Sequence, residues 1–312
     1  MADAVGEGTH HAGRSVTLSI IGNGLAGTAG TAAALYSFNS TAPVIGFVRL
    51  VLGALSLLIL SPFFGGRIRQ LPRLLVRPGV WVMALTSASY QAFFFASVER
   101  AGVATAALVT VGCIPVSAGI VGWLVLREKL RALWFVATAI GVSGLAVASL
   151  GELQTQDAQG LLFAAIAGTG IGGYLTAAKV EIRAGGHPMQ LPGMAYLIGS
   201  CGLFFIVRSD VIQVQWNTQS VLVALYLGVV SMGLANALQI LGLHGIAPGV
   251  AATMMLADPV VAAVLGVVAL HQQLTINGAT GLALVALGLI LQSISPTGRA
   301  SARQQRGRHK FN

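Results

Sequence analysis

The sequence predicts an all-α integral membrane protein with ten transmembrane helices arranged as two inverted five-helix repeats. Three observations predict this fold: an apolar composition, ten apolar stretches of membrane-spanning length, and a pattern around Pro115 that returns around Pro259. Of the 312 residues, 55% are hydrophobic and 9% are charged, whereas about a quarter of the residues in a soluble domain are charged. A chain with so few charges cannot cover a water-facing surface.

The ten stretches follow one another through most of the chain. Crossing the hydrocarbon core requires about 20 apolar residues, and Pro- and Gly-containing breaks such as Arg77-Pro78-Gly79 separate stretches near that length. The predicted spans are 16–36, 43–63, 79–98, 102–125, 132–150, 159–179, 190–208, 219–239, 248–270 and 276–294.

Lys and Arg are distributed unevenly between the two sets of links that join these spans. With the N-terminus inside, fifteen of the 18 basic residues fall on the cytoplasmic side, Arg100 and Arg208 fall outside, and Arg49 lies within a span. Cytoplasmic loops are enriched in Lys and Arg. We therefore expect a multi-pass protein of the cell (plasma or inner) membrane with both termini cytoplasmic. The net charge of +9 then reports orientation in the lipid bilayer, and we expect no nucleic-acid partner.

The ten predicted spans divide into two copies of one unit, with five spans in each copy. A shift of 144 positions superposes Pro115 on Pro259 and Gly144 on Gly288 without a gap. The predicted parts are a cytoplasmic tail (1–15), a first repeat (16–150), a second repeat (159–294) and a basic cytoplasmic tail (295–312). An odd number of spans inverts the second copy, and inverted repeats are typical of transporters with a midplane substrate site where the halves meet.

Two charged residues lie in the interior of predicted spans, away from the span ends. Asp258 directly precedes Pro259, and a carboxylate at this depth should face the protein interior or a wet cavity. It suits a proton-coupling group or a contact for a substrate ammonium; it also suits a cap of the Pro-broken helix or a position near the cytoplasmic interface. Arg49 suits an ion pair with Asp258, a contact for a substrate carboxylate, or an anchor that extends toward the interface.

Pro115 and Pro259 are predicted helix breaks. Each frees a backbone carbonyl one turn earlier and kinks its helix. In a transporter such breaks place polar backbone groups at the cavity, and in any membrane protein they also serve packing alone.

The order of these features resembles the EamA domain of the drug/metabolite transporter superfamily. The matching residues are Pro115, the turn Leu126-Arg127-Glu128-Lys129-Leu130, then Gly141 and Gly144, with Phe47-Val48-Arg49-Leu50 resembling the family's arginine-bearing second helix. In the second copy, His271-Gln272-Gln273 stands where the acidic turn would fall. The resemblance covers about 16–294 and implies a ten-helix carrier of small metabolites, often an exporter of amino acids or related compounds.

The resemblance also implies which polar residues line the cavity. Tyr90, Gln91 and Asn236 lie on segments that correspond to cavity-lining helices of the family, and with Gln239 and Asp258 they form the predicted substrate-binding set. Hydrogen bonds between helices would satisfy the same groups without a substrate.

We therefore expect a secondary active transporter that exports a small metabolite by alternating access, not an enzyme, with no catalytic residue, metal or cofactor. No Walker motif is present for ATP hydrolysis. The alternatives are a passive channel, a lipid or drug flippase, and a membrane-embedded enzyme; the last would need several intramembrane acids or His residues, and Asp258 is the one acid within a span. A coupling proton and a homodimer are left open.

Overall fold

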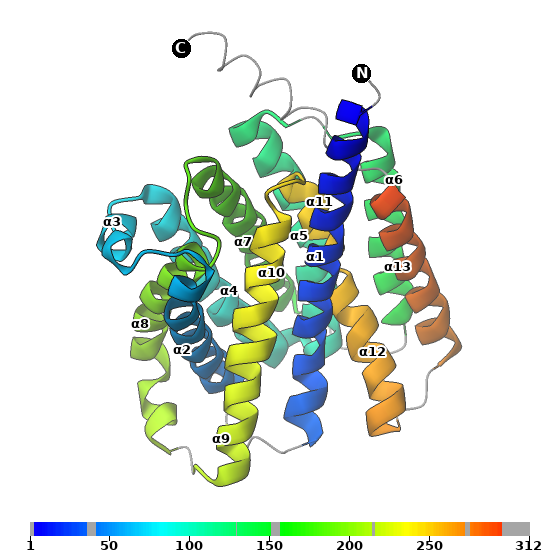
Figure 1. Ribbon diagram of the computed structural model, residues 1–312. Helices are drawn as coiled ribbons and strands as arrows, with labels where there is room; N and C mark the ends of the chain where they lie inside the picture. The colour runs from blue at the N-terminus through cyan, green and yellow to red at the C-terminus, as the bar shows by residue number, and fades with distance from the viewer. Residues whose placement is uncertain are drawn as a thin grey trace.

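The computed structural model describes residues 3–35, 42–128, 130–150, 157–213, 216–271 and 275–294, and within these ranges the chain forms helices and no strand. The first repeat consists of α1 (Asp3–Leu35), α2 (Ala42–Leu60), α4 (Pro78–Ala101), α5 (Val103–Leu126) and α6 (Ala132–Ala148), with the short helices η1 (Ser61–Phe64), η2 (Ile68–Gln70) and α3 (Leu71–Leu74) between α2 and α4. Figure 1 shows the long helices standing side by side as one bundle.

The second repeat also fills five helical stretches, but two of them are not single α-helices. Its elements are α7 (Ala158–Arg183), α8 (Gln190–Gln213), α9 (Thr218–Leu225), the π-helix η3 (Tyr226–Leu234), α10 (Ala235–Gly242), α11 (Pro248–Met254), α12 (Ala257–Leu270) and α13 (Ile276–Ile294). α9, η3 and α10 together occupy the predicted span 219–239, and α11 and α12 occupy 248–270.

Seven helical stretches of the described ranges are long and apolar enough to cross a membrane, and α6 is a shorter apolar helix. α1 and α4, with 33 and 24 residues, are long helices at the two other predicted positions. The structure thus confirms an all-helical fold with membrane-capable helices. The count of ten crossings stays a prediction.

The structure describes most of the predicted N-terminal tail but not the C-terminal one. α1 begins at Asp3, so most of the residues predicted as a tail, 3–15, are helical. The segment is polar, but it contains no proline to stop a helix, and hydropathy marks where a chain leaves an apolar layer rather than where a helix ends. The basic tail 295–312 lies outside the described residues.

Glycines bring the first helix of each repeat against the fourth helical stretch of the other. Gly27 of α1 lies against the backbone carbonyl of Asp258, and Gly168 of α7 lies against the carbonyl of Thr110 in α5. A Cβ on either glycine would collide with that carbonyl, so these close backbone contacts require glycine. Both glycines belong to an Ala-Gly-Thr triplet, which starts at Ala26 in one repeat and at residue 167 in the other.

The last helices of the two repeats, α6 and α13, pack on each other at one flank of the bundle (Figure 1). Gly144 of α6 lies against the backbone of Gly281, and Gly288 of α13 lies against the carbonyl of Ala137. The shift of 144 positions exchanges these two contacts. Such reciprocity is what a twofold relation between two copies produces.

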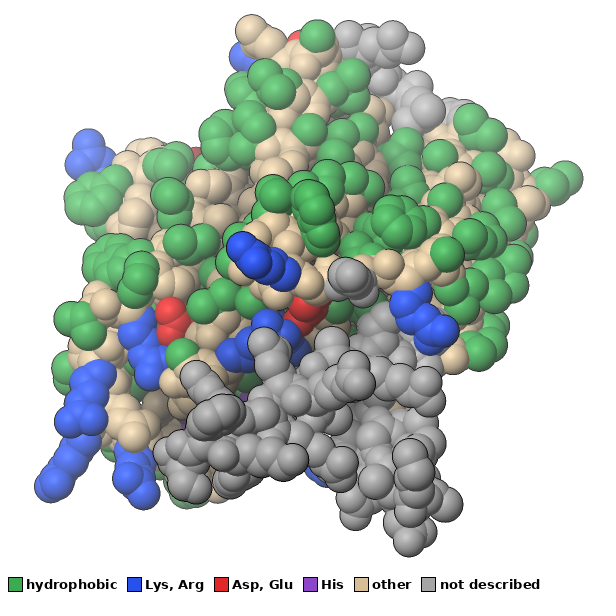
Figure 2. All heavy atoms as spheres, turned by 90° about the horizontal axis from the view of Figure 1, so that it is seen from above, with side chains coloured by type: hydrophobic (Ala, Val, Ile, Leu, Met, Phe, Trp, Pro, Cys, Tyr) green, Lys and Arg blue, Asp and Glu red, His purple; other side chains and the backbone are tan. Residues whose placement is uncertain are grey.

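Ion pairs and hydrogen bonds gather four links at one end of the bundle. Arg77, directly before α4, pairs with Glu181 near the end of α7 at 2.9 Å. Arg183, the last residue of α7, pairs with Glu128 between α5 and α6. Lys179 of α7 donates to the link between α10 and α11. We call this the basic end; Figure 2, viewed from above, shows Lys and Arg side chains around it and hydrophobic side chains over the flanks.

The two repeats run in opposite directions relative to the basic end. Gly242, which closes α10 next to the link that Lys179 binds, lies against Ser15 and Ser19 in the first half of α1. α1 therefore leads away from the basic end, whereas α7 arrives there at Arg183.

Candidate functional site

The fourth helical stretch of the second repeat is interrupted in its middle. α11 and α12 meet at Met255 and Leu256, where the sequence analysis placed one span over 248–270. The N–H of Asp258 bonds to the carbonyl of Met255, three residues back, at 3.1 Å. Pro259 has no N–H and cannot continue the helical ladder. The chain thus separates into two helices just before Pro259, which itself lies in the first turn of α12; the role of Pro259 in this separation stays a prediction.

Asp258 is the second residue of α12 and is half-buried. The positive end of the helix dipole at this position favours a carboxylate. Because Asp258 sits at the middle of a membrane-length stretch, keeping it charged costs about 3 kcal/mol on insertion scales unless protein or water solvates it. Its partial exposure shows that its surroundings are not fully packed.

Arg49 of α2 lies near Asp258 without forming an ion pair with it. The ion pairs of the described chain are Arg77–Glu181, Arg100–Asp157 and Arg183–Glu128. The Arg49 guanidinium donates to Ser231 Oγ of η3 at 3.3 Å, and its buried Nε has no partner in the described chain. The charge of Arg49 still acts on Asp258 electrostatically. The site therefore holds a cation and an anion that act on each other electrostatically without forming an ion pair.

Two tyrosines lie within electrostatic range of these charges. Tyr90 of α4 is half-buried, and the charges of both Arg49 and Asp258 act on it. Tyr196 of α8 is influenced by Arg49 and stacks on Tyr174 of α7, with ring centroids 6.1 Å apart. We call Arg49, Tyr90, Tyr196 and Asp258, together with Asn236 described next, the central cluster.

A chain of hydrogen bonds runs from the central cluster into α1. The Tyr174 hydroxyl donates to Asn236 Oδ1 at 2.8 Å and lies 3.2 Å from the Tyr196 hydroxyl. Asn236 is 3.5 Å from Gln239, whose Nε2 donates to Asn23 Oδ1 at 2.9 Å. Asn236 is half-buried and Gln239 is buried. Of these two predicted ligands, Asn236 is the one with surface free for a substrate.

Two other predicted residues lie differently. Gln91 is buried and donates to the carbonyl of Gly46 at 3.4 Å, which joins α4 to α2. Pro115 lies inside α5, which remains one helix of 24 residues. The charges of Arg49 and Asp258 act on each other and on Tyr90, and Asn236 is connected to them through Tyr174 and Tyr196. Gln91 instead joins α4 to α2, and Pro115 lies within a continuous helix. Their roles in binding stay predictions.

The π-helix η3 faces the same region. Tyr226, its first residue, lies 2.7 Å from the Thr28 hydroxyl of α1, and Ser231 accepts from Arg49. π-helical turns occur frequently at functional sites. Tyr196, Tyr226 and Ser231 were not among the predicted site residues; their hydroxyls within apolar stretches were the signal that could have found them.

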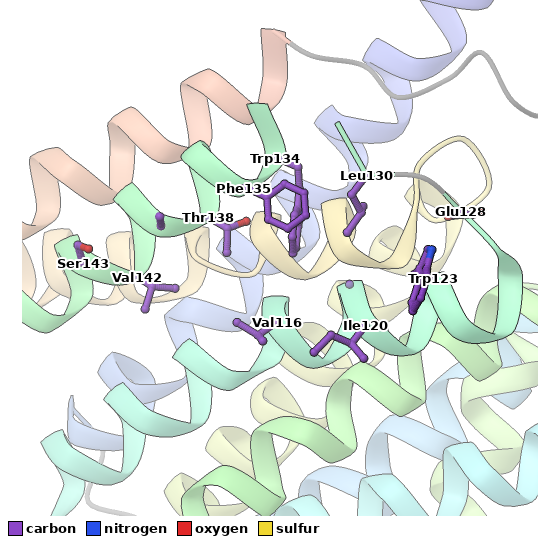
Figure 3. Close-up of a pocket in the computed structure, with 12 residues that line it drawn as sticks. Val116, Ile120, Trp123, Glu128, Leu130, Trp134, Phe135, Thr138, Val142 and Ser143 are labelled. Atoms are coloured by element: carbon purple, nitrogen blue, oxygen red, sulfur yellow. The ribbon is translucent and has the colours of Figure 1, made fainter. Parts of the chain in front are cut away.

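A cavity of about 820 Å³ lies between α5 and α6, apart from the central cluster (Figure 3). Its lining is almost entirely apolar and includes no member of the central cluster. Within the described ranges, no three His, Cys, Asp or Glu side chains are placed to hold a metal ion.

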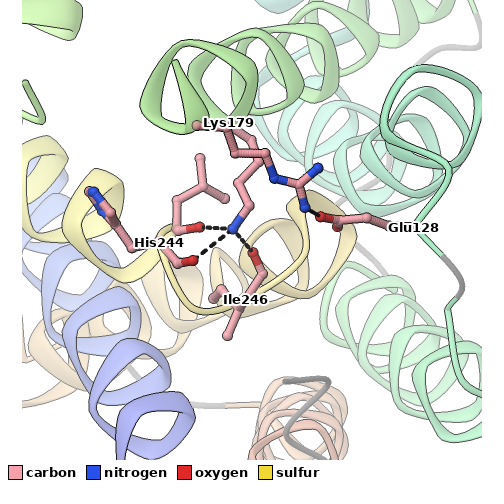
Figure 4. Close-up of polar contacts among 6 residues, drawn as sticks. Glu128, Lys179, His244 and Ile246 are labelled. Atoms are coloured by element: carbon pink, nitrogen blue, oxygen red, sulfur yellow. Dashed lines mark hydrogen bonds and ion pairs between the residues drawn. The ribbon is translucent and has the colours of Figure 1, made fainter. Parts of the chain in front are cut away.

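Lys179 closes the basic end beneath the central cluster. It is 5% exposed, and its ammonium donates to the carbonyls of Leu243, His244 (2.9 Å) and Ile246 (2.9 Å) (Figure 4). Three acceptors satisfy the three protons of an ammonium. From the sequence, Lys179 is counted among the charges of a cytoplasmic link, because hydropathy does not show that α7 continues to Arg183 and packs against the α10–α11 link.

Glu128 lies beside this closure, outside the spans. It pairs with Arg183 through Oε1, and its buried Oε2 has no partner in the described chain. Burial raises the pKa of Glu128 above its ordinary value, and the charges of Lys179 and Arg183 oppose that shift. Two of the ion pairs at the basic end, Arg77–Glu181 and Arg183–Glu128, join one repeat to the other.

The fold and the site together define a helical membrane protein with a discontinuous helix and a central pair of opposite charges. The EamA-like transporter family model matches residues 14–150 and 158–294, which are the two repeats. The chain belongs to the EamA-like transporter family, and it is a membrane protein with multiple transmembrane helices.

Two similar proteins extend this finding. An uncharacterized transporter of Bacillus subtilis (strain 168), YwfM, is 27% identical over 279 residues, covering 88% of this chain and 92% of the relative. A solved crystal structure superposes on this chain with a TM-score of 0.78, and the match covers 90% of this chain and 97% of the other. At 19% identity the second likeness shows the fold alone.

Proposed function

We propose that the protein is a secondary carrier that exports a small metabolite, such as an amino acid or a related amphipathic compound, by alternating access between the two repeats. The proposal includes ten membrane crossings, both termini in the cytoplasm of the cell that carries it in its inner or plasma membrane, and the basic end as the cytoplasmic end. The family, the opposite run of the repeats and the distribution of Lys and Arg support this arrangement.

One observation carries the proposal: Arg49 and Asp258 are opposite charges from different repeats, both half-buried, in one region but not in ion-pair contact. Two such charges would pair directly if their role were structural alone, because an unpaired charge away from water is costly. A zwitterion offers a carboxylate to Arg49 and an ammonium to Asp258. Tyr90, on which both charges act, adds a phenol, and Asn236 adds an amide that is linked to the cluster through the Tyr174 hydroxyl.

The contacts at the basic end indicate how access would alternate. Arg77–Glu181 and Arg183–Glu128 join the repeats, and Lys179 holds the α10–α11 link against α7. A path from the basic end to the central cluster requires these contacts to separate. A coupling proton, for which Asp258 is the candidate carrier, would make that separation depend on the gradient across the membrane.

The experiment is counterflow in proteoliposomes. Protein is reconstituted with an unlabelled pool of amino acids and small metabolites inside, and uptake of each labelled compound is measured with and without an imposed pH gradient. We expect saturable uptake of one chemical class that increases when the same class is inside. Liposomes that contain the same internal pool but no protein are the control.

Other outcomes would replace the proposal. Flux that is not saturable and is not stimulated by internal substrate indicates a channel. Silence across the whole pool, with folded protein confirmed by its thermal transition, contradicts a metabolite carrier and favours lipid or drug movement.

A further inference from the structure

The cavity between α5 and α6 has the dimensions and surroundings of a lipid site. It is lined along α5 by Val116, Ile120 and Trp123 and along α6 by Phe135 and Val142 (Figure 3). Val116, Ile120, Trp123 and Phe135 are 49–59% exposed, so the cavity opens on the outside of the bundle. Its volume of about 820 Å³ lies in the range of sites that enclose small molecules.

The cavity runs from the basic end to the middle of the bundle. Its lining begins at Glu128 and Leu130 and reaches Ser143. Between Ala132 and Ser143, α6 rises by about 16 Å at ~1.5 Å per residue. One leaflet of a bilayer has a hydrocarbon depth of about 15 Å. A single acyl chain extended from the headgroup region to the midplane therefore matches the length of the cavity.

The charges at the basic end of the cavity select among lipids. The link Arg127-Glu128-Lys129-Leu130-Arg131 has three basic residues and one acidic residue, and Arg183 neutralises that acid through Oε1. Arg127 and Arg131 are exposed. The buried Oε2 of Glu128, on the lining of the cavity, has no hydrogen-bond donor in the described chain. Such an end favours a negatively charged phosphate and also accepts a hydrogen bond from a hydroxyl.

We propose that the α5–α6 cavity binds an anionic phospholipid of the leaflet at the basic end. One acyl chain lies between Val116 of α5 and Val142 of α6, the phosphate lies at Arg127 and Arg131, and a headgroup hydroxyl donates to Glu128 Oε2. Phosphatidylglycerol has all three features. The site lies apart from the central cluster and does not depend on which substrate the protein carries. Its occupancy would fix the turn that carries Glu128, and so the ion pair between Glu128 and Arg183.

The test compares phosphatidylglycerol, phosphatidylethanolamine and phosphatidylcholine with identical chains, added to the purified full chain in detergent. Retained lipid is counted by native mass spectrometry, and the Tm is measured in parallel. We expect phosphatidylglycerol to be retained selectively and to raise the Tm most. Each basic residue near a membrane surface contributes roughly fivefold to binding, so the double variant Arg127→Gln/Arg131→Gln should bind it about 30-fold more weakly.

Two further variants complete the test. Ala139→Phe places a ring in the cavity without changing charge and should lower retention of phosphatidylglycerol. Arg73→Gln removes an exposed basic residue of α3, away from the cavity, and should leave retention unchanged. The site is overturned if the three lipids are retained equally, if selectivity survives the double variant, or if Ala139→Phe abolishes a dimer rather than lipid retention, because a second copy would then occupy the cavity.

Discussion

The fourth helical stretches of the two repeats begin from the same sequence pattern and end in different structures. In the first repeat, α5 passes through Pro115 as one helix. In the second, the chain divides into α11 and α12 before Pro259. The residue before each proline differs: buried Ile114 in α5 and half-buried Asp258 at the start of α12.

The difference shows what a proline does and does not determine. A proline removes one N–H in either repeat, yet only one repeat breaks. Ile114 is 3% exposed and packs in the core, whereas a carboxylate gains from lying at a helix N-terminus. We infer that Asp258 and Pro259 together favour the separation, and that Pro115 alone does not. The interruption thus lies beside the charge that the second repeat brings to the central cluster, whereas the equivalent stretch of the first repeat stays one helix.

Replacing each proline by alanine is expected to give the largest difference between the two repeats. Pro259→Ala restores an N–H and lets α11 and α12 join, which moves Asp258 from its helix terminus; we expect counterflow to fall at least tenfold. Pro115→Ala restores an N–H in a helix that is already continuous and should leave counterflow within about twofold. Both variants should keep a cooperative thermal transition. Equal loss in the two variants would contradict different roles for the two prolines.

A second pair of equivalent positions should respond alike to substitution by glycine, because both repeats have the same backbone conformation there. Arg127 directly follows α5 with φ 52°, and His271 directly follows α12 with φ 53°. The shift of 144 positions superposes these two residues. A residue with a Cβ in the left-handed region costs about 1 kcal/mol or more relative to glycine. Arg127→Gly and His271→Gly should each raise the Tm by a few degrees, measured in detergent without added phospholipid.

The difference between the Tm changes of the two glycine variants tests whether the two turns are equivalent. Similar gains support equivalent turns in the two repeats. A gain at one position and a loss at the other would show that one of these side chains makes a contact worth more than the backbone strain.

The smallest expected effect concerns how the first helices of the repeats begin. α7 begins after Asp157, which accepts from the N–H of Gln159 at 2.9 Å, whereas α1 is helical from Asp3 onward. The Gln159 N–H, and to a lesser degree Arg100, hold the pKa of Asp157 below its ordinary value. The stabilisation is therefore full at neutral pH and is lost as the pH falls through this lowered pKa.

Asp157→Asn keeps the cap but removes the charge. We expect an unchanged Tm at neutral pH within about a degree, because Asn caps helices as well as Asp does. Below the ordinary pKa of aspartate, the variant should lose less stability than the parent. A parallel fall of both Tm curves with acid would show that this carboxyl adds nothing.

Hydropathy predicted the helical stretches, and Asp258 and Arg49 became candidates because charges are conspicuous against an apolar background. The repeat boundaries and the roles of the two charges stay predictions. The burial of Lys179 was not predictable, since it depends on the α10–α11 link lying over α7. The same holds for Gln91, whose partner Gly46 is distant in sequence. A one-dimensional pattern also has no sign of the π-helix at Tyr226–Leu234, because it contains no breaking residue other than ordinary glycines.

The most direct test of the central claim uses the substrate that counterflow identifies and an analogue of it without the amine. Apparent affinities of both compounds are measured for the parent, for Asp258→Asn and for the matched control Asp157→Asn. If Asp258 binds the ammonium, removing either group should cost about 30-fold or more, and removing both should cost little beyond one. Asp157→Asn should match the parent. Independent, multiplicative losses from the two changes would contradict a substrate site at the broken helix.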